Sequence, residues 1–319
     1  MTDQPPRSRL EAILRAGHFA VTAELTPPKS AVTEPLIEKA RMVGSYVDAA
    51  NLTDCQTAVV RMSSFACSLV VQNEGVEPVL QMTCRDRNLI GMQADLLGAW
   101  ALGMRNLLAL SGDSPRIGDH PEAKPVFDVN SFKLLKMVRL MGETGTLANG
   151  KPIKVAPRFF LGAAFNPVSV SLDSMVKRLE RKVEKGAEFV QTQMIFDVQQ
   201  FRQLMDRVVA EGLHERVFVL AGVAPLKSVR MAEYMNAHVP GIVVPQPLID
   251  RLKKVEHQGP ERVLAEGVNI CLEIIEGVRN IPGVAGVHIM AVFCEETVPD
   301  IVTRSGLYPR PEVQWEATP

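Results

Sequence analysis

Short apolar runs recur along the chain, and segments with helical periodicity separate them. Eight runs are apolar or β-branched, and most of them end in polar residues, glycine or proline, which is typical of buried strands. They are Val21–Leu25, Tyr46–Leu52, Pro78–Thr83, Leu107–Leu110, Arg158–Ala164, Phe189–Ile195, Val217–Ala221 and Val287–Val292. Strands that are apolar on both faces and alternate with helices form parallel βαβ units, so the pattern predicts a parallel sheet covered by helices.

Helical stripes of apolar residues fill segments between these runs. Three of them are Leu89, Met92, Leu96, Leu97 and Trp100; Met175, Leu179 and Val183; and Leu264, Val268, Cys271 and Ile275. The second stripe has charged residues on its opposite face, and Gly186 stands where a glycine often ends a helix. The stripes therefore predict amphipathic helices after the third, fifth and seventh strands.

Eight strand–helix units predict a closed (β/α)8 TIM barrel. That fold typically takes about 250 residues, and this chain has 319. We expect the surplus in loops at 112–129 and 144–157 and in an additional helix within 243–282. Residues 1–17 are expected to form a polar lead and a short amphipathic turn. A doubly wound open sheet is the alternative, although the Gly-x-Gly-x-x-Gly turn of many nucleotide-binding sheets is missing. No linker interrupts the alternation, so residues 1–319 are expected to form a single domain.

Composition argues against several classes of function. Hydrophobic residues make up 46% of the chain, charged residues 22%, and the formal net charge is −1, which gives no electrostatic case for nucleic acid or membrane binding. No segment reaches the roughly 18 apolar residues of a membrane span, and the first residues lack the apolar core of a signal peptide. The five cysteines form no CxxC pair. We therefore expect neither a disulfide framework nor a zinc site. The same cysteine pattern favours a cytoplasmic location.

The first predicted strand ends in a carboxylate. Glu24 follows an apolar run and precedes Pro27 and Pro28, which stop the strand because neither can donate to a ladder. A carboxylate among apolar residues is costly unless it is paired or neutral. In a barrel this position is the C-terminal rim, where catalytic residues lie. The alternative is a partly exposed or salt-bridged glutamate with no chemical role.

Polar residues follow the other strands as well. They include Asn51, Thr53 and Asp54; the stretch 81–88; Ser111, Gly112 and Asp113; Asn166; and the stretch 191–197, while His288 lies within the eighth run. Each has a structural explanation: Asp86 and Asn88 can cap a helix, residues 111–113 can form a tight turn, and Gln191 and Gln193 can be core amides. Their joint position on one rim instead favours a large polar ligand. Neither a Ser-His-Asp pattern nor a metal-ligand spacing is evident, so we expect a site that orients a cofactor and one acid.

Three motifs together resemble the methylenetetrahydrofolate reductase family. They are Glu-Leu-Thr-Pro-Pro at 24–28, Leu-Ser-Gly-Asp at 110–113 and Thr-Gln-Met-Ile-Phe-Asp at 192–197. The stretches 81–88, 118–128 and 182–187 are most similar to the branch found in acetogenic bacteria and in fusions to homocysteine methyltransferases. The resemblance covers about residues 19 to 307. It implies a (β/α)8 barrel with FAD at its C-terminal face.

The resemblance also implies roles for individual residues. Glu24 corresponds to the general acid that helps open the five-membered ring of methylenetetrahydrofolate. Asp113 corresponds to the aspartate beside the flavin and the pterin, with a catalytic and a binding role, and Gln193 corresponds to the glutamine that binds the pterin. The implied cofactor contacts are Asn51, Thr53, Gln81, Ser111, Gly112, Asp113, Phe165 and Lys182. Ser111, Gln81 and Phe165 replace an Arg, a His and a Tyr of better-known members, and residues 290–294 depart from the Leu-Asn-Arg pattern that those members carry.

The leading hypothesis is a flavin-dependent reductase that converts 5,10-methylenetetrahydrofolate to 5-methyltetrahydrofolate by hydride transfer from reduced FAD. NAD(P)H is either the direct electron donor or an indirect one, and the branch resemblance implies that a partner subunit can feed electrons to the flavin. We also expect an oligomer. One alternative is a flavin-free folate-binding methyltransferase barrel. Another is a regulatory or scaffold subunit without activity, against which the joint presence of Glu24, Asp113 and Gln193 argues.

Overall fold

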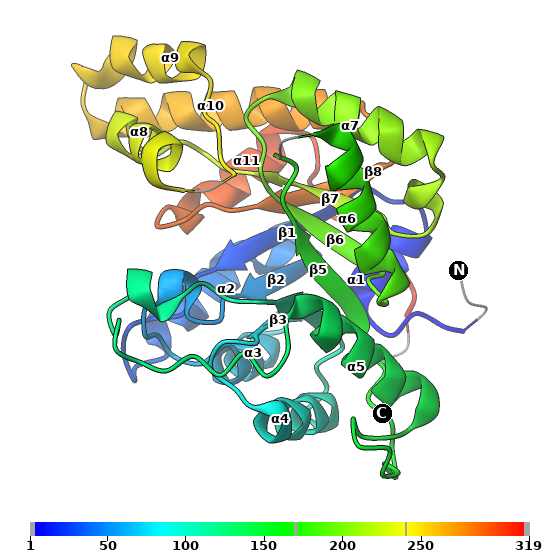
Figure 1. Cartoon of the computed structure of the whole chain (residues 1–319). Coiled ribbons are helices and arrows are strands. Elements are labelled where there is room, and N and C mark those ends of the chain that lie inside the picture. The colour runs from blue at the N-terminus through cyan, green and yellow to red at the C-terminus, as the bar shows by residue number, and fades with distance from the viewer. Residues whose placement is uncertain (1–3, 169–170, 240, 316–319) are drawn as a thin grey trace.

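Eight parallel strands form a closed barrel in a computed structural model that describes residues 4–168, 171–239 and 241–315 (Figure 1). The strands are β1 (Ala20–Leu25), β2 (Ala49–Leu52), β3 (Pro78–Thr83), β4 (Asn106–Leu110), β5 (Phe160–Phe165), β6 (Phe189–Met194), β7 (Phe218–Val223) and β8 (Val284–Ile289). Each strand pairs with its neighbours in chain order, and β1 pairs with β8, where Thr22 stands opposite His288. The predicted TIM barrel is confirmed, and the closure of the sheet excludes the open-sheet alternative.

The strand bounds differ from the predicted ones by at most three residues. The second strand begins at Ala49 instead of Tyr46, because Gly44–Tyr46 forms a 3-10 turn. The eighth begins at Val284 and ends at Ile289, because Gly286 already pairs with β1 and β7. Adding a Cβ at Gly286 would bring it to 2.4 Å from a backbone oxygen of β1. The close approach of the two strands requires glycine at this position. Because glycine is not part of an apolar run, the apolar pattern placed the start of the strand too late.

Helices cover the outside of the barrel and close one of its ends (Figure 1). They are α1 (Arg9–Arg15), α2 (Glu34–Val43), α3 (Ser64–Asn73), α4 (Leu89–Ala101), α5 (Ser131–Thr144), α6 (Leu172–Glu184), α7 (Val198–Ala210), α8 (Val229–His238), α9 (Gln246–Glu256), α10 (Pro260–Arg279) and α11 (Val298–Arg304). The three predicted stripes lie on α4, α6 and α10, and the additional helix expected within 243–282 is α9. Residue Gly186 follows the C-cap of α6 with a positive φ of 110°, as a helix-ending glycine does.

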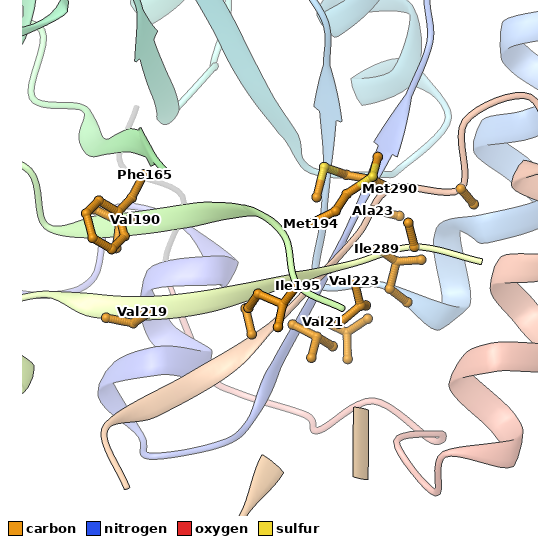
Figure 2. Packing of buried hydrophobic residues seen from close by; sticks show 14 of the residues in the cluster. Val21, Ala23, Phe165, Val190, Met194, Ile195, Val219, Val223, Ile289 and Met290 are labelled. Carbon is orange, nitrogen blue, oxygen red and sulfur yellow. The ribbon is translucent and has the colours of Figure 1, made fainter. Parts of the chain in front are cut away.

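Two apolar cores lie on opposite sides of the strands. The outer core fills the space between strands and helices, and Figure 2 shows part of it, with Phe165 beside Val190. The inner core occupies the N-terminal half of the barrel. It consists of Ala20, Ala49, Val79, Leu108, Phe160, Phe189 and Leu220 from the strands and Leu10, Ile13 and Leu14 from α1.

Helix α1 closes the N-terminal end of the barrel. Residues Leu10 to Leu14 are all buried, Ser8 caps the helix, and Glu77 accepts backbone N–H bonds from Arg9 and Leu10 at 2.6 and 2.9 Å. The short amphipathic turn predicted for this segment is therefore a buried helix that plugs the barrel. Polar and partly exposed inward-facing residues remain at the C-terminal end, and this end holds the candidate site.

Candidate active site

Alternation along β1 turns Glu24 into the barrel. Val21, Ala23 and Leu25 belong to the outer core and Ala20 to the inner core, so Glu24 lies on the inner face. Its side chain is 16% exposed. Pairing with β2 places it opposite Asn51, at the C-terminal end of both strands.

Burial gives Glu24 the pKa of a usable acid. Burial raises the pKa of Glu24 from 4.5 to about 7. A hydrogen bond from the side chain of Gln81 lowers this pKa, and the nearby carboxylate of Glu295 raises it further. Lys39 binds Glu295 at 2.7 Å and so moderates that last effect. Near pH 7 a substantial fraction of Glu24 is protonated, which is the condition for an efficient proton donor.

A hydrogen-bonded group of four side chains, which we call the polar layer, lies directly beneath Glu24. It consists of Thr22, Asn51, Gln191 and His288, all of them buried. The amides of Asn51 and Gln191 bond to each other at 2.6 and 3.0 Å, Gln191 Nε2 donates to Thr22 Oγ1 at 3.1 Å, and Thr22 Oγ1 lies 2.9 Å from His288 Nδ1. Burial lowers the pKa of His288 to about 3, so the imidazole is neutral.

Two predicted cofactor contacts, one at the end of β2 and one just after it, are already engaged within the protein. Asn51 is fully buried in the polar layer, and Thr53, also buried, donates from its hydroxyl to Gln56 Oε1 at 2.6 Å. Gln191 is a buried amide whose hydrogen bonds are made within the protein, so the structural explanation offered for it from the sequence holds. By contrast, Gln81 on β3 does contact the acid, since it donates to Glu24.

The loop after β4 carries Asp113 to the edge of the barrel mouth. Asp113 is exposed, and its Oδ2 accepts the backbone N–H of Thr57 at 3.0 Å. Thr57 has a positive φ of 54°, an unusual conformation for a non-glycine residue. Gly112 has a φ of 86°, and a Cβ there would come to 3.0 Å from Thr83, so the turn needs glycine. Ser111 bonds through its hydroxyl to Ser131, the first residue of α5.

Gln193 and Lys182 lie on neighbouring units of the barrel. Gln193 is half-buried, and its Oε1 accepts the N–H of Met194 at 3.1 Å, where the pairing of β6 with β7 is irregular. Lys182 on α6 is 6% exposed, and its Nζ is 4.7 Å from the centre of the Phe132 ring. Burial, together with Arg178, lowers the pKa of Lys182 to about 8. Within the described residues its ammonium group has neither an ion pair nor a hydrogen bond.

One predicted cofactor contact does not join this group. Phe165 is 3% exposed and packs in the outer core beside Val190 (Figure 2). Its neighbour Ala164 is the exposed residue of β5, so the inward-facing position at this strand end is 164. Alternation from Gly162, which faces the Phe189 ring of the inner core, was the signal in the sequence that could have shown this.

An exposed aromatic residue at the mouth was missed by the sequence analysis. Phe293, just after β8, is 58% exposed and has a positive φ of 58°. Lys227 donates to its carbonyl at 2.6 Å, and the guanidinium of Arg61 is 5.9 Å from the centre of its ring. The adjacent Cys294 is fully buried. Backbone strain of this kind in a bulky residue is common at functional sites. The sequence did not reveal it, because the identity of a residue does not determine its φ angle.

The opposite face of the barrel has a cavity of about 660 Å³. Its walls come from α1, α5 and the starts of β5 and β7, with Phe160 and Phe218 among them, and the predicted site residues do not line it. Five arginines and four glutamates surround it, so its charges nearly balance. In the part of the chain that the structure describes, no cluster of three or more His, Cys, Asp or Glu residues could hold a metal ion, and no helix is long and apolar enough to cross a membrane.

Comparisons with known proteins point in one direction. A sequence model of the family described as methylenetetrahydrofolate reductase matches residues 9–306. Methylenetetrahydrofolate reductase 1 of Schizosaccharomyces pombe is 29% identical over 240 residues, which cover 73% of this chain and 36% of that protein. The 5,10-methylenetetrahydrofolate reductase of Escherichia coli is 25% identical over 214 residues, which cover 65% of this chain and 64% of that protein. The chain thus spans little more than a third of the length of the first curated relatives it matches, at 36% and 35%.

A solved structure shares the fold. It is a protein from Clostridium thermocellum described as binding two copies of 5-methyl-5,6,7,8-tetrahydrofolic acid. It superposes with a TM-score of 0.63 and 14% identity, and the match covers 94% of this chain and 100% of that one. At this level of identity the likeness bears on the barrel and its connectivity alone.

Proposed function

This chain belongs to the methylenetetrahydrofolate reductase family, and from that membership we propose that it reduces 5,10-methylenetetrahydrofolate to 5-methyltetrahydrofolate with FAD as the bound cofactor. The observation that carries the proposal is Glu24. It is a carboxyl group at the C-terminal rim of the barrel, its side chain is 16% exposed, and burial raises its pKa to about 7. An acid of this kind at this rim fits a reaction that begins with protonation of the substrate.

The proposed reaction assigns each residue one task. Glu24 gives its proton to the departing ring nitrogen of the folate, the bond between that nitrogen and the methylene carbon breaks, and an iminium forms on the other nitrogen. Gln81 holds the carboxyl of Glu24 through its hydrogen bond, while Gln193 and Asp113 bind the pterin. Reduced flavin, when bound, supplies the hydride that converts the iminium to a methyl group.

The chain has groups that suit FAD. Lys182 is a buried ammonium without an ion-pair partner among the described residues, and a phosphate of the cofactor would compensate its charge. Gly112 packs against Thr83 and Arg85 with no room for a side chain, and this tight turn presents Ser111 and Asp113 at the edge of the barrel mouth. We propose four of these residues as cofactor contacts: Lys182, Ser111, Gly112 and Asp113. Gln81 is a further candidate, whereas Asn51, Thr53 and Phe165 would have to exchange present contacts to take part.

We further propose that the barrel binds both flavin and folate as a single domain, residues 1–319, and that the chain belongs to the acetogen-type and methyltransferase-fused branch. Support for the branch comes from the stretches 81–88, 118–128 and 182–187. The departures at Gln81, Ser111 and Cys294 allow a site that receives electrons from a partner subunit in place of direct use of NAD(P)H. The oligomer and the cytoplasmic location stay predictions.

Purified protein tests the proposal directly. We expect FAD to bind with a shift of its visible absorbance, and the reduced complex to convert methylenetetrahydrofolate to 5-methyltetrahydrofolate. A protein that neither contains nor binds flavin but transfers a methyl group from folate would establish the methyltransferase alternative instead. Turnover by the lone polypeptide with NADH would rule out the need for a partner subunit, while turnover with a chemical reductant but not NAD(P)H would support one.

A further inference from the structure

The hydrogen bonds of the polar layer beneath Glu24 indicate where its protons lie. Gln191 Nε2 carries two protons, and its nearest acceptors are Asn51 Oδ1 at 3.0 Å and Thr22 Oγ1 at 3.1 Å, while His288 Nδ1 lies farther away, at 3.4 Å. Asn51 in turn donates from Nδ2 to Gln191 Oε1 at 2.6 Å. Thr22 Oγ1 is therefore an acceptor from Gln191, and its own hydroxyl proton is free to be donated onward.

The hydroxyl proton of Thr22 has one good acceptor. His288 Nδ1 lies 2.9 Å from Thr22 Oγ1, whereas the carbonyl of Val287 lies at 3.5 Å, which is long for a hydroxyl donor. Because Nδ1 accepts, a neutral imidazole must carry its proton on Nε2. That nitrogen is the one that faces the acid, 4.0 Å from Glu24 Oε2.

We propose that His288 is a positioning residue that holds a neutral Nε2–H toward Glu24 and bonds to the carboxylate once Glu24 has given up its proton. At 4.0 Å the donor scarcely affects the protonated acid. A small movement brings it into hydrogen-bond range of the carboxylate, which is the stronger acceptor. The proposal rests on the proposed role of Glu24 as an acid, and it assigns to the polar layer the task of fixing the tautomer.

The neutral state of the imidazole is essential to this arrangement. An imidazolium beside Glu24 would hold the carboxyl ionised and remove its proton. Thr22 occupies Nδ1, and the imidazole is buried, so protonation of His288 is disfavoured. The charged groups around the pair in the described structure are Glu24 itself on β1, Glu295 in the turn Glu295–Thr297, and Lys39 of α2, which binds Glu295 at 2.7 Å.

The tautomer can be measured without folate or flavin. In protein labelled with 15N-histidine, long-range proton–nitrogen correlations distinguish the two neutral tautomers from imidazolium, and the spectrum of His288→Gln identifies the His288 signals among the six histidines. We expect the Nε2–H form throughout about pH 5 to 9. An Nδ1–H form would mean that the hydroxyl of Thr22 donates to the carbonyl of Val287 or that the amide pair of Asn51 and Gln191 is reversed. It would overturn the proposal, as would titration of His288 near its ordinary pKa of about 6.5.

Two substitutions test the effect on Glu24. His288→Leu keeps an apolar side chain in the barrel but removes the donor, so the pKa of Glu24, followed by the 13C shift of its carboxyl carbon, should rise by about one unit. His288→Gln restores an N–H at the same reach and should return the pKa of Glu24 to within a few tenths of its original value. In the folate reaction, His288→Leu should lower the rate at acidic pH and move the decline toward higher pH.

The outcomes separate this proposal from the proposed function. If the carboxyl pKa of Glu24 stays unchanged in His288→Leu, with thermal unfolding showing a folded protein, the positioning role is wrong whether or not the enzyme turns over folate. If the pKa moves but the original protein has no folate activity, the proposed function is wrong and the contact between His288 and Glu24 stands.

Discussion

The substitution Glu24→Gln should make the protein more stable and much less active. In the folded protein the pKa of Glu24 is about 7, against 4.5 for the exposed group. An elevated folded pKa means that ionisation costs stability as pH rises from 4.5 toward 7, and the cost is complete above 7. A difference of 2.5 pKa units corresponds to about 3 kcal/mol. Glutamine has nearly the same shape and no charge, so the variant avoids this cost.

The assay is chemical denaturation of both proteins across about pH 4 to 9. The variant and the original should have similar unfolding free energies at the acidic end, and the variant should gain up to about 3 kcal/mol at the alkaline end. Other titrating groups are common to both proteins and cancel in the difference. In the same variant, flavin binding should persist while folate turnover falls by about 10²–10⁴-fold, the usual contribution of a general acid. A stability difference that does not change with pH, or rapid folate reduction by the variant, would refute the reasoning.

Three further predictions concern the acid, the cofactor site and the fold. Because Glu24 must be protonated to act, the rate at which folate oxidises the reduced flavin should fall about tenfold per pH unit above about 7 in stopped-flow measurements, and a flat profile would contradict this. Lys182→Gln should weaken FAD binding about tenfold or more in absorbance titrations, because a buried charge partner of the phosphates is lost, whereas Lys177→Gln on the exposed face of α6 should have little effect. Asp54→Ala should lower the unfolding free energy by about 3–5 kcal/mol, because the buried Asp54 binds Arg87 at 2.7 Å and the N–H and hydroxyl of Thr83 at 2.8 and 2.9 Å. Loss of the exposed partner of the same arginine, in Asp95→Ala, should cost less than about 1 kcal/mol, and equal losses in the two variants would contradict the account.

The architecture of this chain could be predicted because the same strand–helix pattern recurs along the sequence. Each strand is a short apolar run, and three of the helices between them show clear stripes, so an error of three residues at one end, as at Ala49, does not change the topology. Helix α1 was underestimated for a physical reason. It has seven residues, too few to show a stripe, and its burial depends on Glu77 and on the open end of the barrel, which lie far along the chain.

The site was predictable only in part. Residue type and strand position identified Glu24, because an apolar strand that ends in a carboxylate is unusual in itself. The sequence could not show that Asn51 is already bonded to Gln191, since the partner is 140 residues away. The outward position of Phe165, by contrast, follows from regular alternation along β5, because Phe160, Gly162 and Ala164 share the inner face. Contacts across the barrel depend on the register of all eight strands, which no local pattern contains.

A single-turnover experiment tests the central claim most directly. The FAD-loaded protein is reduced without oxygen, and methylenetetrahydrofolate is then added while the flavin absorbance is followed. The account predicts rapid return of the oxidised flavin spectrum with one equivalent of 5-methyltetrahydrofolate formed per flavin. A flavin that stays reduced in the presence of excess methylenetetrahydrofolate, in protein shown to be folded and loaded, would contradict it.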